Sequence, residues 1–282
     1  MNWITEHKLP FGEFIEGIVD FLVDNGAGFF DAISESLSSL IYGLTDLLLW
    51  VPPGVMVALF AVAAYFRHRS WGLAVFTLIS FLLIWNLGYW EDTMATLSLV
   101  LYATLLCVVI GIPLGIYAAH HQWLYKGLQP VLDLMQTIPP FVYLIPTLTL
   151  FGLGVVPGVI STVIFAIAAP VRLTYLGISQ VPTELVEAGK AFGCTNRQLL
   201  FRIELPAAMS SIGAGITQCI MLSLSMVVIA ALVGADGLGV PVVRALNTVD
   251  IGKGFEAGRS SCWRSGWTGS SVSATHREPQ YD

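Results

Sequence analysis

Long apolar stretches alternate with short polar ones along most of this 282-residue chain. About twenty consecutive apolar residues are enough for one helix to cross the hydrocarbon core of a bilayer. Runs close to this length occupy residues 47–66, 71–90, 95–119, 131–152, 155–175 and 207–233. The pattern predicts an all-α integral membrane protein, a polytopic helical bundle with about six spans.

The polar loops between these runs carry basic residues on alternate sides. Arg67 and Arg69 follow the first run, whereas Glu91 and Asp92 follow the second. Basic residues return after the third and fifth runs, namely His120, His121, Lys126, Arg172, Lys190, Arg197 and Arg202. Because cytoplasmic loops are enriched in Lys and Arg, we expect these loops inside and the N-terminus outside.

Residues 1–46 form an acidic segment, which holds eight acidic residues and a single lysine. Phe11, Ile15 and Leu22 recur at helical spacing, with acidic residues elsewhere on the helical wheel. An amphipathic helix on the outer membrane surface would have this pattern, and so would a solvated tail without a specific role.

Composition supports a membrane protein and argues against several functions. Apolar residues make up 55% of the chain, charged residues only 11%, and the mean hydropathy is +0.75. The net charge of −6 disfavours a nucleic-acid partner. The runs at 95–119 and 207–233 hold no Asp, Glu, Lys, Arg or His, although ion-coupled carriers need such residues within the membrane. The sequence also has no metal-ligand spacing, catalytic cluster or phosphate-binding loop, so any ATP-driven work should come from another subunit.

One polar block, residues 183–206, lies between two of the apolar runs, and we call it the elbow. Thr183 is expected to cap a first short helix, and Gly193 to end it. Thr195 and Gln198 have the spacing of a capping box, which predicts a second short helix. Pro206 is expected to terminate that second helix, because proline cannot donate a backbone hydrogen bond.

The first helix of the elbow has an apolar stripe at positions i, i+3 and i+7, formed by Leu185, Ala188 and Phe192. A short rigid helix with one apolar face suits docking into a groove on a partner. The same pattern also suits an ordinary loop helix that packs on its own spans, and the residues alone do not separate the two interpretations.

The elbow resembles a known signature. Glu187-Ala188-Gly189, then Gly193, then Ile203-Glu204-Leu205-Pro206 resembles the E-A-A…G…I-x-L-P signature of ABC-importer permease subunits. In that family the block is a coupling helix that sits in a cleft of the ATP-hydrolysing subunit. The resemblance therefore implies a coupling role for Glu187, Ala188, Gly189, Gly193, Leu205 and Pro206. The family usually has Ala at the position of Gly189, and Gly lowers helix propensity by about 1 kcal/mol.

The resemblance covers residues 95–258. The stretches "TLLCVVIGIPLGI", "QTIPPFVYLIPTLTLFGLGVVPG" and "LSLSMVVIAALVGADGLG" are similar to the permease subunit of glycine betaine/proline-betaine (osmoprotectant) importers. This resemblance implies a type I, methionine-permease-like fold over 95–258, preceded by two N-terminal spans within 47–94. It also implies that the chain couples ATP hydrolysis in a partner subunit to alternating access for glycine betaine, proline betaine or a related quaternary-ammonium solute.

The same resemblance implies the partners. They are an ATP-binding subunit that holds ATP and Mg, a second copy of the permease, a separate substrate-binding protein and the lipid of a bacterial inner membrane. No cofactor is expected in this chain, which is then a transporter subunit and not an enzyme. One alternative is an ABC permease for another small solute, such as choline, carnitine or methionine. The alternative from another class is an ion-coupled carrier or channel.

Proline-rich residues in the run at 131–152 are candidates for the translocation path. Pro139 and Pro140 free backbone carbonyl groups, which are tolerated at membrane depth where they face protein or a water-filled path. Phe141 and Tyr143 could offer aromatic faces to a quaternary ammonium group. The competing interpretation is a kinked helix that only packs.

The chain departs from the family after Gly258. Where the resemblance implies a last apolar span, residues 259–282 form a polar tail that cannot cross a bilayer, so the last span is missing or altered. A shift of reading frame near codon 258 is one hypothesis, because one choice of codons for 259–269 encodes an apolar stretch in another frame. A divergent natural tail is the other hypothesis, and the sequence of the gene's 3′ end distinguishes them.

Overall fold

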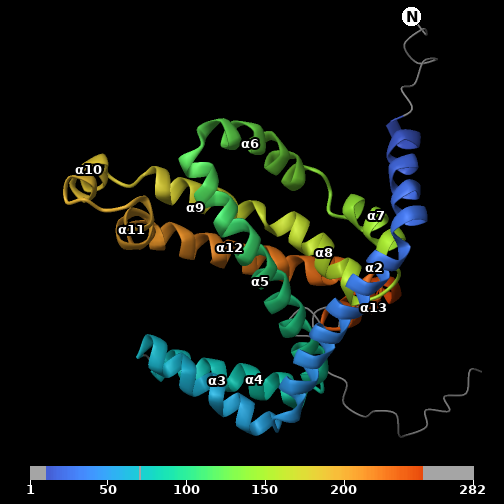
Figure 1. Ribbon diagram of the computed structural model, residues 1–282. Coiled ribbons are helices and arrows are strands. Elements are labelled where there is room, and N and C mark those ends of the chain that lie inside the picture. Colours follow the sequence, from blue (N-terminus) through green and yellow to red (C-terminus); the bar gives the residue numbers. More distant parts are fainter. Residues whose placement is uncertain (1–10, 70, 250–282) are drawn as a thin grey trace, which may run out of the picture.

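The computed structural model describes residues 11–69 and 71–249, which form helices and no strand (Figure 1). The first part of the acidic segment, residues 1–10, and the polar tail at 259–282 lie outside the described residues. In chain order the helices are α2 (Phe11–Trp50), α3 (Pro53–His68), α4 (Trp71–Asn86), α5 (Trp90–His120), α6 (Gln122–Thr137), α7 (Phe141–Phe151), α8 (Val155–Ala166), α9 (Ala168–Ser179), α10 (Thr183–Ala191), α11 (Asn196–Leu199), the π-helical turn η1 (Leu200–Glu204), α12 (Leu205–Ala231) and α13 (Gly239–Thr248).

Helices α5, α8, α9 and α12 pack together as the core of the bundle. Helices α8 and α9 follow each other closely enough to form one apolar span, Val155–Ser179. Fully buried core residues come from several of these helices, including Leu99, Ala103, Val159 and Ala230. Burial of these side chains is the expected source of cohesion for a helical bundle, because dispersion contacts accumulate where side chains interlock.

Small residues let the core helices approach closely. A Cβ atom at Gly115 of α5 would lie 2.7 Å from Cβ of Thr174 in α9. A Cβ atom at Gly177 of α9 would lie 2.8 Å from Cβ of Ser211 in α12. Glycine at these two positions therefore permits backbone contact between α5, α9 and α12, as is common between membrane helices.

The N-terminal region forms a single long helix, α2, that continues past residue 46 to Trp50. Its Ile41 lies in the main core, and the ring of Phe30 meets Phe151 of α7 edge-on at 5.3 Å between centroids. The chain then bends by 95° between Val19–Trp50 and Pro53–Phe66. The predicted single span at 47–66 is therefore wrong, because consecutive prolines at 52 and 53 end one helix and begin the next.

A second bend of 95° separates Gln122–Thr137 from Phe141–Phe151. Ile138 is extended, with ψ of 131°, as expected for a residue that precedes proline. The predicted single span at 131–152 is thus two helices, α6 and α7, that meet at Pro139 and Pro140. The apolar pattern could not show this bend, because apolar residues continue through it.

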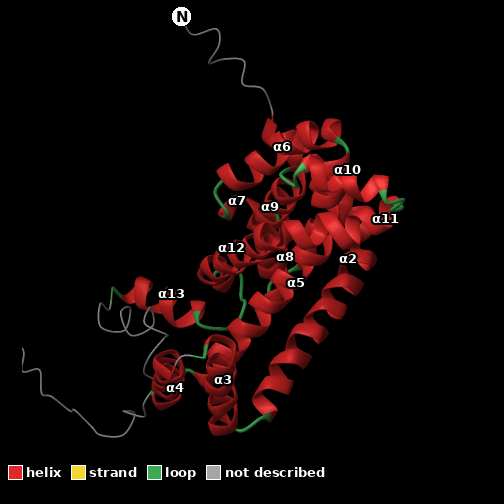
Figure 2. Ribbon diagram, turned by 90° about the vertical axis from the view of Figure 1, so that its left-hand side faces the viewer, coloured by secondary structure: helices red, strands yellow, loops and turns green. Residues whose placement is uncertain are grey.

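Helices α3 and α4 form an antiparallel hairpin beside the main bundle (Figures 1 and 2). The rings of Phe60 and Phe81 stack between them with centroids 4.8 Å apart. Large apolar side chains remain exposed on the hairpin, among them Phe66, Trp71 and Phe76. An apolar surface of this kind suits contact with lipid or with another membrane protein.

Within the described part of the chain, three helices are long and apolar enough to cross a membrane: Trp90–His120, Val155–Ser179 and Asn196–Ala231. The number rises to five if each bent pair counts as one span. Helix α4 is apolar, but its 16 residues are fewer than the roughly 20 of a typical span. The apolar runs predicted from the sequence thus correspond to several apolar helices, some of which are bent or shorter than a typical span.

Candidate functional site

The elbow projects from one end of the bundle, where α9 leads into it and α12 leads away (Figure 1). Helix α10 forms its first half, and α11 with the turn η1 forms its second half. The views in Figures 1 and 2 agree that α10 and α11 lie far from α13. The polar block predicted from the sequence is therefore a folded element at one extremity of the molecule.

Gly193 forms the corner of the elbow, as predicted. Its φ of 80° lies in the left-handed region, which glycine adopts without the steric cost that a Cβ atom brings. Its N–H donates to the carbonyl of Lys190 at 2.9 Å, and the N–H of Cys194 donates to the carbonyl of Gly189 at 3.0 Å. These two bonds satisfy carbonyl groups at the end of α10 and fix the direction of the following chain.

Of the two caps predicted at the starts of the elbow helices, the first is wrong and the second is confirmed. Thr183 is the first residue of α10 and Pro182 occupies the cap, so the predicted cap is wrong by one residue. The predicted capping box is confirmed. The backbone N–H of Thr195 donates to Oε1 of Gln198 at 2.9 Å, and the N–H of Gln198 donates to Oγ1 of Thr195 at 3.4 Å.

Pro206 does not terminate the second helix of the elbow, contrary to the prediction. The chain remains helical from Asn196 to Ala231, and Pro206 lies in the first turn of α12. The wider π-helical turn Leu200–Glu204 precedes it, and the N–H of Leu205 donates to the carbonyl of Leu200. A π turn shifts the hydrogen-bond register and thereby accommodates a residue without an N–H group.

The elbow presents apolar side chains to its surroundings. The exposed fraction is 91% for Phe192, 49% for Leu185 and 66% for Phe201 of η1, and Ala188 is exposed as well. Isolated exposed apolar residues are ordinary, but several large ones on one small projecting element mark an interaction surface. The predicted apolar stripe therefore does not pack on the spans of its own chain.

Some signature residues of the elbow are exposed and others are buried. Glu187, Ala188 and Gly193 are exposed, and so is Pro206. Gly189 is buried, and a Cβ atom there would overlap with Cδ1 of Ile203 and lie 2.9 Å from Cδ1 of Leu199. Leu205 is half-buried and packs beside Ile178, Ala208 and Ile212. The inward residues hold the two halves of the elbow together, while the outward residues are available to a partner.

An ion pair at the base of the elbow was not predicted from the sequence. Nε2 of His120, the last residue of α5, lies 3.0 Å from Oε2 of Glu204 in η1. The Glu204 side chain is 8% exposed and that of His120 is 43% exposed. A sequence signal does exist, because an acidic residue between Ile203 and Leu205 is unexpected in a segment that enters a membrane helix.

The four candidate path residues lie at the bend between α6 and α7, away from the elbow (Figure 1). Pro139 and Phe141 are exposed, whereas Pro140 and Tyr143 are half-buried. Oη of Tyr143 donates to the carbonyl of Leu134 at 3.2 Å and so bridges the two sides of the bend. The bend brings these residues together, and their role in a path stays a prediction.

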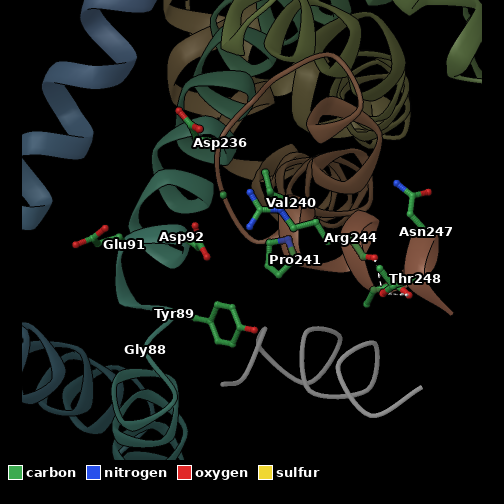
Figure 3. A pocket seen from close by; sticks show the side chains of 12 residues that line it. Gly88, Tyr89, Glu91, Asp92, Asp236, Val240, Pro241, Arg244, Asn247 and Thr248 are labelled. Carbon is green, nitrogen blue, oxygen red and sulfur yellow. Dashed lines mark hydrogen bonds between the residues drawn. The ribbon is translucent and has the colours of Figure 1, made fainter. Parts of the chain in front are cut away.

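A cavity of about 660 Å³ opens beside α13 (Figure 3), in the part of the bundle remote from the elbow (Figure 1). It lies between the start of α5, the loop before α13, and α13 itself. Its charged lining residues are Glu91, Asp92, Asp236 and Arg244, and the Arg244 side chain points toward α5 in Figure 3. Oη of Tyr42 donates to Oδ2 of Asp236 at 3.5 Å, which connects α2 to this region.

Comparison with known proteins finds one matching family and several relatives of this chain. Residues 111–269 match the family described as the binding-protein-dependent transport system inner membrane component. The glycine betaine transport system permease protein OpuAB of Bacillus subtilis (strain 168) is 46% identical over 251 residues, which are 89% of each chain. The glycine betaine/carnitine transport permease protein GbuB of Listeria monocytogenes serotype 1/2a (strain 10403S) is 46% identical over 257 residues, again 89% of each chain. The glycine betaine/proline betaine transport system permease protein ProW of Escherichia coli (strain K12) is 43% identical over 87% of this chain and 70% of ProW.

A solved structure of the MetNI methionine ABC transporter in an inward-facing conformation shares the fold. Its TM-score is 0.53, with 62% of this chain and 86% of that chain covered, at 21% sequence identity. At this level of identity the likeness concerns the fold alone. It confirms the predicted all-α bundle of the methionine-permease-like class.

Proposed function

Because this chain belongs to the family of binding-protein-dependent transport system inner membrane components, we propose that it is the membrane-spanning permease subunit of an ATP-driven importer for glycine betaine, proline betaine or a related quaternary-ammonium solute. The observation that carries the proposal is the 46% identity to OpuAB over 89% of both chains. The projecting elbow supports the same function. Another protein must drive the movement of such a subunit, and the exposed apolar side chains of the elbow offer that protein a surface to bind.

In this proposal the elbow is the segment that the ATP-binding subunit contacts and moves. A separate ATP-binding subunit holds ATP and Mg and moves the elbow when it closes. The elbow continues directly into α9 and α12, so its displacement tilts these core helices. Tilting of packed helices against a partner alternately opens a path to the two sides of the membrane.

The proposal includes three further elements. A second copy of the chain and membrane lipid cover apolar side chains that remain exposed on α5 and α12, such as Leu101, Leu105, Met209, Met221 and Leu224. The elbow lies on the cytoplasmic side, so the cavity near Arg244 faces outward, where a substrate-binding protein delivers the solute. The N-terminus then lies outside, as the distribution of basic residues favours.

The bend at Pro139 and Pro140 is proposed to border the path. Phe141 is exposed there and can present its ring face to a quaternary ammonium group, which aromatic rings attract. Replacement of Phe141 by Leu keeps the site apolar but removes the ring, so a lower uptake rate with unchanged amounts of protein in the membrane would support this placement.

Uptake of labelled glycine betaine tests the proposed function. Cells that lack their own osmoprotectant carriers receive this chain together with the neighbouring genes for an ATP-binding subunit and a binding protein, and are then stressed with high osmolarity. We expect uptake that requires all three proteins and an intact ATPase. Uptake without the ATPase would instead indicate an ion-coupled carrier, and no uptake with all proteins in the membrane would overturn the assigned substrate class.

Carnitine is a second candidate substrate, because GbuB is described as a glycine betaine/carnitine permease protein. Competition distinguishes the two solutes in the same cells. Unlabelled glycine betaine should abolish uptake of the label at a lower concentration than carnitine does, and the reverse order would assign the chain to carnitine.

A further inference from the structure

The ion pair between His120 and Glu204 connects the elbow to a helix that it does not adjoin in the chain. The backbone joins α10 of the elbow to α9 through residues 180–182, and η1 of the elbow continues directly into α12. Helix α5 ends at His120, well before the elbow in the sequence, and reaches the elbow through this contact of 3.0 Å. Of the two ion pairs in residues 11–69 and 71–249, it is the one that involves the elbow.

The surroundings of His120 determine which of its ring nitrogens faces Glu204. Nδ1 lies 2.9 Å from the backbone carbonyl of Ile116, and a carbonyl oxygen only accepts, so Nδ1 carries a hydrogen atom. Nε2 then faces Oε2 of Glu204, where a lone pair on each atom would repel. The contact is a close approach of the imidazole ring to a buried carboxylate oxygen that forms no hydrogen bond with the described residues, and it becomes an ion pair whenever the imidazole is protonated.

Burial makes the pair asymmetric. Glu204 is almost fully buried whereas His120 is partly exposed, so the carboxylate depends on the histidine for compensation of its charge. Loss of one partner of a buried pair is strongly destabilising, because the other charge remains without hydration or a counterion. The position of Glu204 in the π turn ties this charge directly to the root of the elbow.

We propose that His120 and Glu204 are positioning residues that transmit displacement of the elbow to α5. When the elbow moves, Glu204 moves with it. The contact between Glu204 and His120 then displaces the C-terminal end of α5 in the same direction. Helix α5 packs against α9 through Gly115, so the three core helices α5, α9 and α12 then tilt together. The inference rests on the proposed function, because it concerns how work from the ATP-binding subunit reaches the core.

Transport by the reconstituted importer tests this inference. The chain, its ATP-binding subunit and its binding protein are placed in proteoliposomes, and glycine betaine uptake and ATP hydrolysis are measured together. We expect His120→Gln and Glu204→Gln to lower uptake per ATP roughly tenfold or more, whereas His120→Lys, which places a permanent cation beside Glu204, should restore most of it. His121→Gln is the matched control, because Nδ1 of His121 also contacts a carbonyl four residues earlier, at 3.1 Å, and should leave uptake per ATP unchanged.

A double variant separates coupling from folding. His120→Gln with Glu204→Gln removes both charges, so the amount and thermal stability of the assembled importer should recover while uptake per ATP stays low. Recovery of both quantities, or single variants with normal uptake per ATP, would overturn the transmission role. Failure of the unaltered importer to transport glycine betaine would contradict the proposed function instead, and the variants would then be compared through stimulation of ATP hydrolysis by the binding protein.

Discussion

At the scale of single residues, two glycines of the elbow differ in how strictly the structure requires glycine. Gly193 needs its left-handed backbone, with φ of 80°, and open space surrounds the place where a Cβ atom would lie. Gly189 has an ordinary helical backbone, but a Cβ atom there would meet Ile203 and Leu199. Both neighbouring atoms are ends of flexible side chains, so an added methyl group at 189 can be accommodated by rotation.

Substitutions at these glycines should therefore have different effects. Gly193→Ala is expected to reduce the free energy of unfolding by about 1–2 kcal/mol, because alanine is strained in the left-handed region. Gly193→Pro should abolish coupled uptake, since it also forbids the observed φ and removes the N–H bond to Lys190. Gly189→Ala should retain uptake. Thermal denaturation in detergent and uptake assays measure these effects.

Gly213 of α12 provides the control, because nothing lies within 4 Å of its Cβ position and its backbone is helical. Gly213→Ala should keep or raise the denaturation temperature, as alanine favours a helix by about 1 kcal/mol. Equal losses for the alanine variants at 193 and 213 would contradict the conformational argument.

Residue-scale features could be predicted from the sequence where they depend on neighbours in the chain. The capping box and the corner at Gly193 are of this kind, because each involves residues within a few positions. The contact between His120 and Glu204 could not be predicted, since it depends on how α5 and η1 pack in three dimensions. The burial of Gly189 was hidden for the same reason.

At the scale of elements, proline acts according to its surroundings. Prolines at 52 and 53 separate α2 from α3, and those at 139 and 140 separate α6 from α7. Pro206, in contrast, lies within a continuous helical segment. The π turn η1 shifts the backbone hydrogen bonds by one residue there and so accommodates a residue without an N–H group. The apolar pattern located the helices well but not their bends, because hydrophobicity is continuous across Val51 and Ile138 while backbone geometry is not.

Replacement of Pro206 tests the role of the π turn. In Pro206→Ala the restored N–H can join a regular α-helix, so the denaturation temperature should stay equal or rise. Uptake per ATP should fall, because a shift of one residue rotates Glu204 by about 100° away from His120. Pro130→Ala is the control, since Pro130 lies inside helix α6, far from η1 in the chain. Unchanged coupling in Pro206→Ala would show that the π turn does not position Glu204.

At the scale of the whole molecule, the elbow and the cavity near Arg244 lie at remote ends of the bundle (Figures 1 and 2). This separation is what a transport subunit needs if ATP acts at one end and solute enters at the other. The class of protein followed from composition and the signature, whereas the number of straight spans did not. The predicted polar tail lies outside the described residues, and its origin stays a hypothesis for gene sequencing.

Thiol labelling tests the orientation of the molecule in the membrane. Cys194 is partly exposed at the elbow, whereas Cys107 and Cys219 are buried. In a Cys262→Ser background, a membrane-impermeant maleimide should label Cys194 in inverted membrane vesicles and not in intact spheroplasts. Cys194→Ala should remove the signal. Labelling from the outside would place the elbow, and with it the N-terminus, on the opposite sides to those proposed.

The short hairpin of α3 and α4 also has a consequence for the surrounding bilayer. Each helix has 16 residues and thus a length of about 24 Å, while a typical hydrocarbon core is about 30 Å thick. If the hairpin crosses the membrane, the bilayer around it must be locally thinner, or the flanking side chains must reach toward the interface. The acyl-chain length of the host membrane would then affect this subunit directly.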